Sequence, residues 1–182
     1  METITEKKTT WKLDPAHSEI GFKVKHMMIT NVSGSFEKFD AHVETTGVDF
    51  ITAKIEFTAD VSSITTNNAD RDTHLKSADF FDAANHPHLK FVSTKVERKD
   101  DDNYLVQGNL TIRDVTKPVQ LNAEFGGIGK DPWGNEKAGF TITGKINRTD
   151  YKLNWNAALE AGGVLVGEEV KIQAELQLIK QA

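Results

Sequence analysis

Apolar and polar residues alternate through nearly the whole chain, and this period of two constrains the fold more than any other feature. Successive side chains of a β-strand point to opposite faces, so each alternating segment predicts a strand with one apolar and one polar face. A sheet of such strands removes its exposed edges by closing into a barrel. We therefore predict an all-β fold, an extended eight-stranded antiparallel barrel, with strands at residues 20–24, 39–43, 53–59, 89–91, 104–112, 119–125, 138–146 and 170–178.

Two segments interrupt the alternation. In residues 67–81, Asn68 is placed to cap a helix whose first turn holds Asp70 and Asp72, which predicts one short helix between the third and fourth strands. Residues 154–163 predict one or two helical turns that end at Gly162. No linker or repeat divides the chain, so we expect a single domain over residues 11–182, preceded by a polar N-terminal tail at residues 1–10.

Composition excludes several classes of function. The 182 residues carry 22 Lys+Arg against 27 Asp+Glu, a formal net charge of -5, which argues against a nucleic-acid partner. The chain has no cysteine, and therefore no disulfide or thiol chemistry. Its start lacks a signal-peptide pattern, and no stretch approaches the roughly 20 apolar residues of a membrane helix. We expect a cytoplasmic location as given, a periplasmic one if a leader has been removed, and no stable membrane insertion.

No motif for catalysis or metal binding is found in the sequence. The close pair His86 and His88 flanks Pro87, which holds the backbone extended and points the two rings apart. Helical spacing places Asp70 and His74 on one face and Asp72 on another. We predict no catalytic residues, no metal site and no required cofactor.

Strand parity brings polar residues to one rim of the barrel. Extending three strands past their last apolar residue turns His26, Asp114 and Arg148 inward, and the helix carrying Arg71 and His74 leaves the third strand at the same end. In one interpretation Arg148 pairs with Asp114 or another carboxylate and closes the barrel, because a buried charge must be paired. In the other, the cluster binds the polar head of a ligand. The two interpretations are compatible.

The predicted interior contains many small residues, namely Gly34, Ala41, Ala53, Ala59, Gly108, Ala123, Ala138 and Gly144. An eight-stranded barrel is filled by side chains or holds one ligand, and a dry apolar void selects an apolar guest. The alternative is a packed barrel that acts through its outer surface. The residues expected to line a channel are Phe22, Val24, Phe36, Ile55, Phe57, Phe91, Leu110, Phe125, Phe140, Ile142 and Trp155, with His26, Arg71, His74 and Arg148 at a polar rim.

Met27, Met28 and Ile29 form an apolar segment where a hairpin turn is normally polar. Methionines suit adaptable hydrophobic surfaces. The segment predicts either a gate or membrane-touching tip, or packing beneath the neighbouring helix.

Five collinear segments resemble the YceI-like family of lipid-binding barrels over about residues 11–180: WKLDPAHSEIGFKVKH, NADRDTHLKSADFFDAANHPHLKF, GNLTIRDVTKPVQL, GFTITGKINRTDY and VGEEVKIQAELQL. The resemblance implies a bacterial protein with a lipocalin-like barrel that binds, transports or sequesters a polyisoprenoid or a fatty-acyl lipid, without catalysis. A homodimer is compatible with it. Two alternatives remain, a structural or stress-response module that acts through its surface, and an enzyme with His26 or His74 as acid or base.

Overall fold

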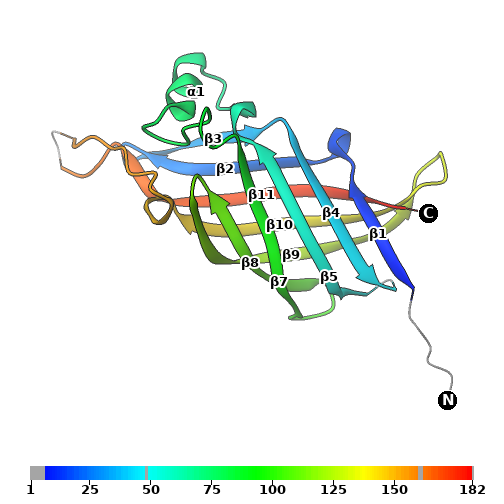
Figure 1. The fold of residues 1–182 in the computed structure, drawn as a ribbon. Helices are drawn as coiled ribbons and strands as arrows, with labels where there is room; N and C mark the ends of the chain where they lie inside the picture. Colours follow the sequence, from blue (N-terminus) through cyan, green and yellow to red (C-terminus); the bar gives the residue numbers. More distant parts are fainter. Residues whose placement is uncertain (1–6, 48, 160–161, 182) are drawn as a thin grey trace.

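Strand β11 (Val166–Lys180) closes the sheet, because it pairs with β10 (Glu136–Asn147) on one side and with β1 (Lys8–Leu13) and β2 (Glu19–His26) on the other. The computed structural model describes residues 7–47, 49–159 and 162–181, which form one 11-stranded antiparallel sheet (Figure 1). The ring continues from β1 through β4 (Phe39–Thr46), β5 (Asp49–Asp60), β7 (His88–Arg98), β8 (Asn103–Ile112) and β9 (Val115–Lys130) to β10. The predicted closed eight-stranded barrel is therefore confirmed.

Two of the eight barrel strands are each divided by a bend, one into β1 and β2 and the other into β3 (Thr30–Phe36) and β4. The 3-10 turn Pro15–His17 separates β1 from β2, and Glu37 and Lys38 separate β3 from β4. At one end β1 pairs with β4 as well as β11, whereas at the other end β3 pairs with β2 and with the two-residue β6 (Ile64–Thr65). The barrel is thus tightly closed at the β1–β4 end and splayed at the β2–β3 end.

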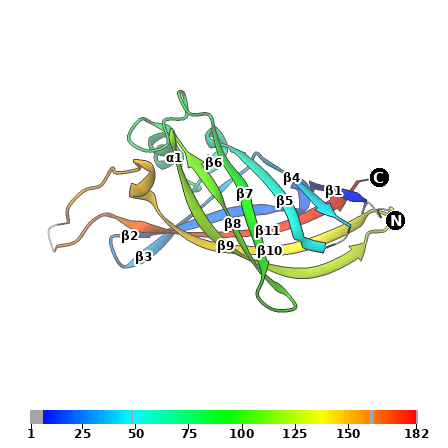
Figure 2. The ribbon, with the colours of Figure 1, turned by 60° about the horizontal axis from the view of Figure 1, so that its bottom comes forward.

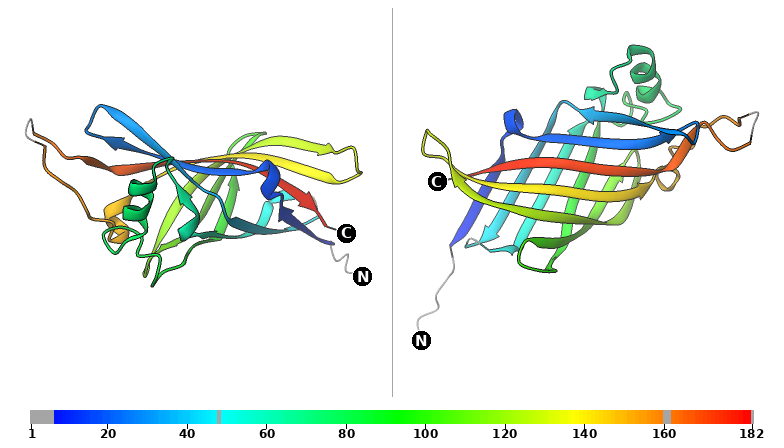
Figure 3. Two further views of the ribbon diagram at one scale, coloured as in Figure 1. Left: turned by 90° about the horizontal axis from the view of Figure 1, so that it is seen from above. Right: turned by 180° about the vertical axis from the view of Figure 1, so that it is seen from behind.

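The barrel is flattened into two layers. Seen from behind, β2, β11, β10 and β9 run side by side in one layer, and β4, β5, β7 and β8 cross them at an angle in the other (Figure 3). The β2–β3 turn and the segment between β10 and β11 project from the same end, while β1 and the end of β11 lie at the opposite end (Figure 2).

The expected polar tail is shorter than predicted. Lys8, Thr9 and Thr10 already belong to β1, where Thr9, Trp11 and Leu13 are buried in alternation. Threonines hide this period in the sequence because they fit a buried face as well as a polar one. Residues 1–6 lie outside the described residues.

The predicted helix is confirmed and the second helical segment is wrong. Helix α1 (Ala69–Lys76) lies between β6 and β7, and the Asn68 side chain accepts a hydrogen bond from the Arg71 backbone N–H at 3.0 Å. The described residues of 154–163 are not helical and carry a bridge between Ala158 and Val164. The carbonyls of Leu153 and Trp155, at the start of this segment, accept hydrogen bonds from a buried arginine described below, so they are not free to begin a helix. Among the described residues, no helix is both long and apolar enough to cross a membrane.

Candidate functional site

A cavity of about 600 Å³ runs through the barrel. Its wall on β11 extends from Val166 to Leu178, which corresponds to roughly 40 Å of extended strand. The alternating positions between them, Val170, Ile172, Ala174 and Leu176, also face the cavity. Known small-molecule sites occupy about 300–1,000 Å³, so this cavity has the size of a ligand site and the length of a chain-like guest.

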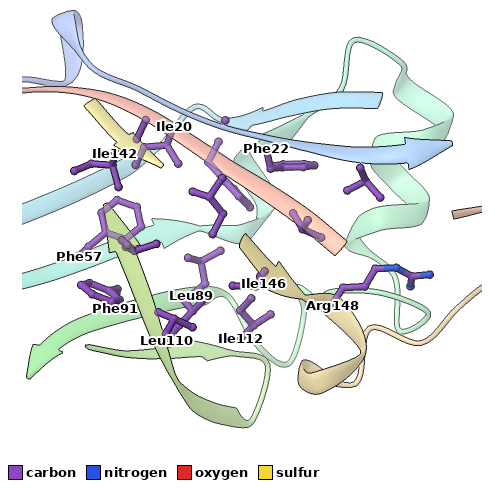
Figure 4. A pocket seen from close by; sticks show the side chains of 18 of the residues that line it. Ile20, Phe22, Phe57, Leu89, Phe91, Leu110, Ile112, Ile142, Ile146 and Arg148 are labelled. Carbon is purple, nitrogen blue, oxygen red and sulfur yellow. The ribbon is translucent and has the colours of Figure 1, made fainter. Parts of the chain in front are cut away.

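Most of the predicted channel residues lie on the cavity wall (Figure 4). They are Phe22, Val24, Phe36, Ile55, Phe57, Phe91, Leu110, Phe140, Ile142 and Trp155. Phe125 departs from the prediction, because its ring packs against Phe50 and Phe140 with centroids 5.6 and 5.2 Å away. Strand parity alone cannot tell a wall position from one that fills the end of a barrel.

Phe50 is a cavity residue that the sequence pattern missed. It lies at an even position of β5, whereas the apolar face of that strand follows the odd positions 53–59. The register between β4 and β5 shifts between the pairs Glu44–Lys54 and Thr46–Asp49, so the alternation is interrupted between Phe50 and the odd positions that begin at Ala53. Other wall residues follow the alternation of their strands, as the sequence indicated. They include Ile20, Leu89 and Ile112.

The small inward residues serve two purposes. Ala41, Ala53 and Ala123 line the cavity and leave it open. The glycines instead make room for neighbouring side chains, since a Cβ at Gly34 would lie 2.3 Å from the ring of Phe22, and one at Gly108 would lie 2.5 Å from the ring of Phe91. The glycines therefore allow large rings to lie flat along the wall, and the alanines supply the free volume.

One end of the cavity is filled by aromatic rings. Trp11 is fully buried, and its ring centroid lies 5.3 Å from that of Phe50, which in turn lies 4.9 Å from Phe140. Such tilted and edge-to-face contacts are the favourable geometries for aromatic pairs. We call Trp11, Phe50, Phe125 and Phe140 the aromatic plug.

The opposite end of the cavity is polar and is centred on Arg148. This side chain is 3% exposed and donates only to backbone carbonyls: Nε to Gly167 at 2.7 Å, Nη1 to Trp155 at 3.0 Å and to Leu153, and Nη2 to Val166 at 3.1 Å. Burial lowers the pKa of the Arg148 guanidinium. The charge is thus well hydrogen-bonded, but none of these contacts is with a carboxylate.

The predicted pairing of Arg148 with Asp114 is not formed. Asp114 is exposed and its Oδ2 accepts from Lys152 Nζ at 3.1 Å, which holds the pKa of the Asp114 carboxyl below its usual value. The backbone turns between β8 and β9 at Arg113, where φ is 57°. This turn interrupts the strand parity that had placed Asp114 inside the barrel.

The other predicted rim residues, His26, Arg71 and His74, all lie on the cavity wall. Arg71 donates from Nε to Thr66 Oγ1 at 2.7 Å and from Nη2 to the Thr66 carbonyl at 2.8 Å, which anchors α1 to the residue that follows β6. The His74 ring stands edge-on to Trp155 at 4.7 Å, so α1 contacts the segment that Arg148 holds. We call the end bounded by His26, Arg71, His74, Arg148 and Trp155 the mouth.

The charge at the mouth is mainly positive. Lys25, Arg71 and Arg148 line this end together with one carboxylate, Asp70. Within the part of the chain that the structure describes, no three His, Asp or Glu side chains are grouped so that they could hold a metal ion.

The fold and the cavity define a class of protein, a closed antiparallel barrel with an elongated apolar interior, an aromatic end and a polar mouth. The family model of the YceI-like domain matches residues 11–178. The chain belongs to the YceI-like family.

Related sequences and structures agree with this assignment. A UPF0312 protein of Staphylococcus aureus (strain MSSA476) is 41% identical over 170 residues, which cover 93% of this chain and 96% of that protein. The Campylobacter jejuni YCEI protein is 32% identical, with a TM-score of 0.74 and full coverage of both chains. A polyisoprenoid binding domain from Saccharophagus degradans is 13% identical with a TM-score of 0.65, covers 94% of this chain and 98% of that one, and shares the fold.

Proposed function

We propose that this protein binds a long-chain amphiphilic lipid of the polyisoprenoid type, with the chain in the cavity and the head at the mouth, and carries or sequesters it. The observation that carries the proposal is a long cavity with an almost wholly apolar wall that ends in a polar mouth. A dry apolar cavity favours an apolar guest, because burying each CH₂ group of a lipid is worth about 0.8 kcal/mol.

The shape of the cavity favours a chain over a compact ring system. The wall follows β11 from Val166 to Leu178, and branched and aromatic side chains line it from several strands. A flexible chain with repeated methyl branches can follow such a narrow path, and a fatty-acyl chain is the closest alternative. The polyisoprenoid binding domain of Saccharophagus degradans, which shares this fold, supports the isoprenoid choice.

The mouth favours a head that carries negative charge. A guanidinium has five N–H donors, and the backbone carbonyls accept four hydrogen bonds from Arg148, which leaves one N–H of Nη2 for a ligand. Neutral carbonyls do not cancel the charge of Arg148, and Lys25 and Arg71 add to it on the same wall. Glu168 attracts the Arg148 charge without accepting a hydrogen bond from it, and a carboxylate or phosphate head would accept the N–H that remains.

Binding explains the site better than catalysis does. His74 is packed against Phe80 and Trp155 and pairs with Asp79, and the Arg71 guanidinium donates to Thr66. These groups hold the mouth together and are not arranged around one reacting atom. We therefore assign them to positioning α1 at the mouth and the head of the ligand.

The test is uptake of a fluorescent polyprenyl or fatty-acyl probe by a variant whose cavity is blocked. Ala174→Phe adds a ring from the inner face of β11, and Gln173→Phe adds the same ring on the exposed face one residue away. We expect probe affinity to fall by at least about tenfold for Ala174→Phe, as the loss of a few buried CH₂ contacts implies, and to be unchanged for Gln173→Phe.

Thermal unfolding of both variants identifies a folding defect. A folded Ala174→Phe protein that takes up the probe as well as the unmodified protein would contradict the proposal. The same holds if the unmodified protein takes up neither probe and releases no lipid on solvent extraction.

A further inference from the structure

The turn between β2 and β3 exposes three large apolar side chains. Met27 is 44% exposed, Met28 57% and Ile29 74%. Val164, on the segment that leads into β11, is 38% exposed, and Met28 Sδ lies against Gly163 of the same segment. We call Met27, Met28 and Ile29 the apolar tip.

The backbone of the apolar tip is strained. Met27 and Met28 both have positive φ, 51° and 63°, and the Ile29 N–H donates to the His26 carbonyl at 3.2 Å, which forms a β-turn with two left-handed central residues inside a three-residue connection. Asn and Gly are the residues that favour this conformation in hairpins. Two largely exposed methionines therefore stand where Asn or Gly would make the turn itself more stable, so the stability of the turn does not account for their presence.

A row of lysines lies behind the apolar tip on the outer face of the sheet. Lys171 of β11 is opposite Lys23 of β2 on one side and Lys145 of β10 on the other. Like charges on directly opposed cross-strand positions are destabilising. Lys145 has Glu169 4.0 Å away, so the row is only partly neutralised, although the whole chain has a net charge of -5.

The apolar tip, the lysine row and the mouth share one end of the barrel. His26, the last residue of β2, lines the cavity, and the Met27 N–H donates to the carbonyl of Leu165, which also lines it. The β2–β3 turn and the segment before β11 project together from this end (Figures 1 and 3). A surface that contacts the tip would therefore lie next to the mouth.

We propose that the apolar tip docks into the surface of a membrane that contains anionic lipids, with the lysine row against the lipid headgroups. Burial of methionine and isoleucine side chains among the acyl chains makes the free energy of binding more favourable. Each lysine near an anionic surface adds an electrostatic attraction. The positive charge of the lysine row is complementary to the negative charge of anionic headgroups, and this favours such a membrane as the partner. Docking would place the mouth at the bilayer, where a long-chain lipid can enter or leave without crossing water.

The test is co-sedimentation with vesicles of equal parts phosphatidylcholine and phosphatidylglycerol, compared with vesicles of phosphatidylcholine alone. The variant Met27→Asn with Met28→Gly removes the apolar side chains and supplies the residues that the turn prefers, so its melting temperature should be unchanged or higher. We expect its vesicle affinity to fall by at least about tenfold, as the loss of two buried methionines implies. A protein whose affinity is unchanged by this variant would overturn the proposal.

Two further variants locate the contact. Lys23→Gln with Lys171→Gln should weaken binding to the anionic vesicles by about tenfold or more, with no change on phosphatidylcholine. The control is Trp133→Ser in the β9–β10 turn, because Trp133 is 83% exposed at the opposite end of the barrel. Unchanged binding of this control supports docking through the mouth end, and loss of binding would overturn it.

The remaining outcomes are equally decisive. No sedimentation with either vesicle, or a dimer in light scattering that the Met27→Asn, Met28→Gly variant abolishes, would overturn membrane docking. Uptake of the acyl probe in vesicle-free solution should be the same for this variant as for the unmodified protein. Failure of probe uptake with intact vesicle binding would therefore contradict the cavity proposal and leave the docking proposal standing.

Discussion

The two ends of the barrel are stabilised in different ways. At the closed end, β1 pairs with both β4 and β11, and the rings of the aromatic plug fill the space between them. At the mouth, β3 pairs with β2 on one side but has only the two-residue β6 on the other, and α1 has no buried residue. Side-chain packing closes one end, whereas hydrogen bonds from Arg71 and Arg148 to backbone oxygens hold the other.

This difference suits the proposed binding of a lipid inside the barrel. Packed aromatic rings cannot separate without losing much of their burial, so the closed end stays shut. Hydrogen bonds from an arginine to carbonyl groups can be exchanged for hydrogen bonds to water or to a ligand, at a modest net cost each. The mouth can therefore open locally while the closed end preserves the fold.

The largest effect is expected at the closed end. Trp11→Ala should lower the free energy of unfolding by about 3–5 kcal/mol, because it leaves a large cavity among the rings of the aromatic plug. Trp133→Ala is the matched control, since this ring is 83% exposed, and it should change stability by less than about 0.5 kcal/mol. Urea unfolding measures both, and a loss below about 1 kcal/mol for Trp11→Ala would show that the plug does not hold this end.

Arg148→Met should have the next largest effect, a loss of about 2–4 kcal/mol, because it leaves buried carbonyls without a donor. Arg148→Lys should recover only part of this, since one ammonium cannot reach all four carbonyls in the fork geometry of a guanidinium. Hydrogen exchange should rise near Leu153 and Val166 and stay unchanged near Trp11. Faster exchange throughout the barrel would contradict local control of the mouth.

The ion pair at the closed end should contribute less, and its contribution should depend on pH. The hydrogen bond from Lys137 Nζ to Asp14, 2.8 Å long and nearly buried, holds the pKa of the Asp14 carboxyl below its ordinary value of 3.8. A lowered pKa stabilises the fold above the unfolded pKa, and this stability is lost as the pH falls through the folded value. Asp14→Asn should therefore cost about 1–2 kcal/mol at pH 7, and the difference should shrink below about pH 4. A difference that is independent of pH would exclude the ion pair as its cause.

The same type of ion pair at the mouth should have the smallest effect. The side chains of Lys152 and Asp114 are 58% and 56% exposed, so solvent and salt screen their attraction. We expect Asp114→Asn to change the free energy of unfolding by less than about 0.5 kcal/mol at pH 7, with a correspondingly small dependence on pH. A loss as large as that of Asp14→Asn would mean that the mouth is also held by ion pairs.

The sequence pattern predicted the closed barrel and α1 with its Asn68 cap, and ten of its eleven channel residues lie on the cavity wall, because these features depend on alternation and on local capping. It did not predict β1 fully, since threonines suit either face, nor the role of Phe50, which follows a shift of register. It also paired Arg148 with Asp114, because parity cannot foresee that the turn at Arg113 points Asp114 outward. The sequence also did not predict that backbone carbonyls between residues 153 and 167 bind the Arg148 guanidinium. These contacts depend on how the irregular segment between β10 and β11 folds back around the arginine.

The most direct test of the container is a crystal structure of the protein purified from cells without delipidation. We predict continuous elongated density along β11, from Val166 at the mouth to the aromatic plug, with its polar end next to Arg148. A barrel whose wall side chains have closed on one another, or whose interior holds only separate water molecules, would contradict the account.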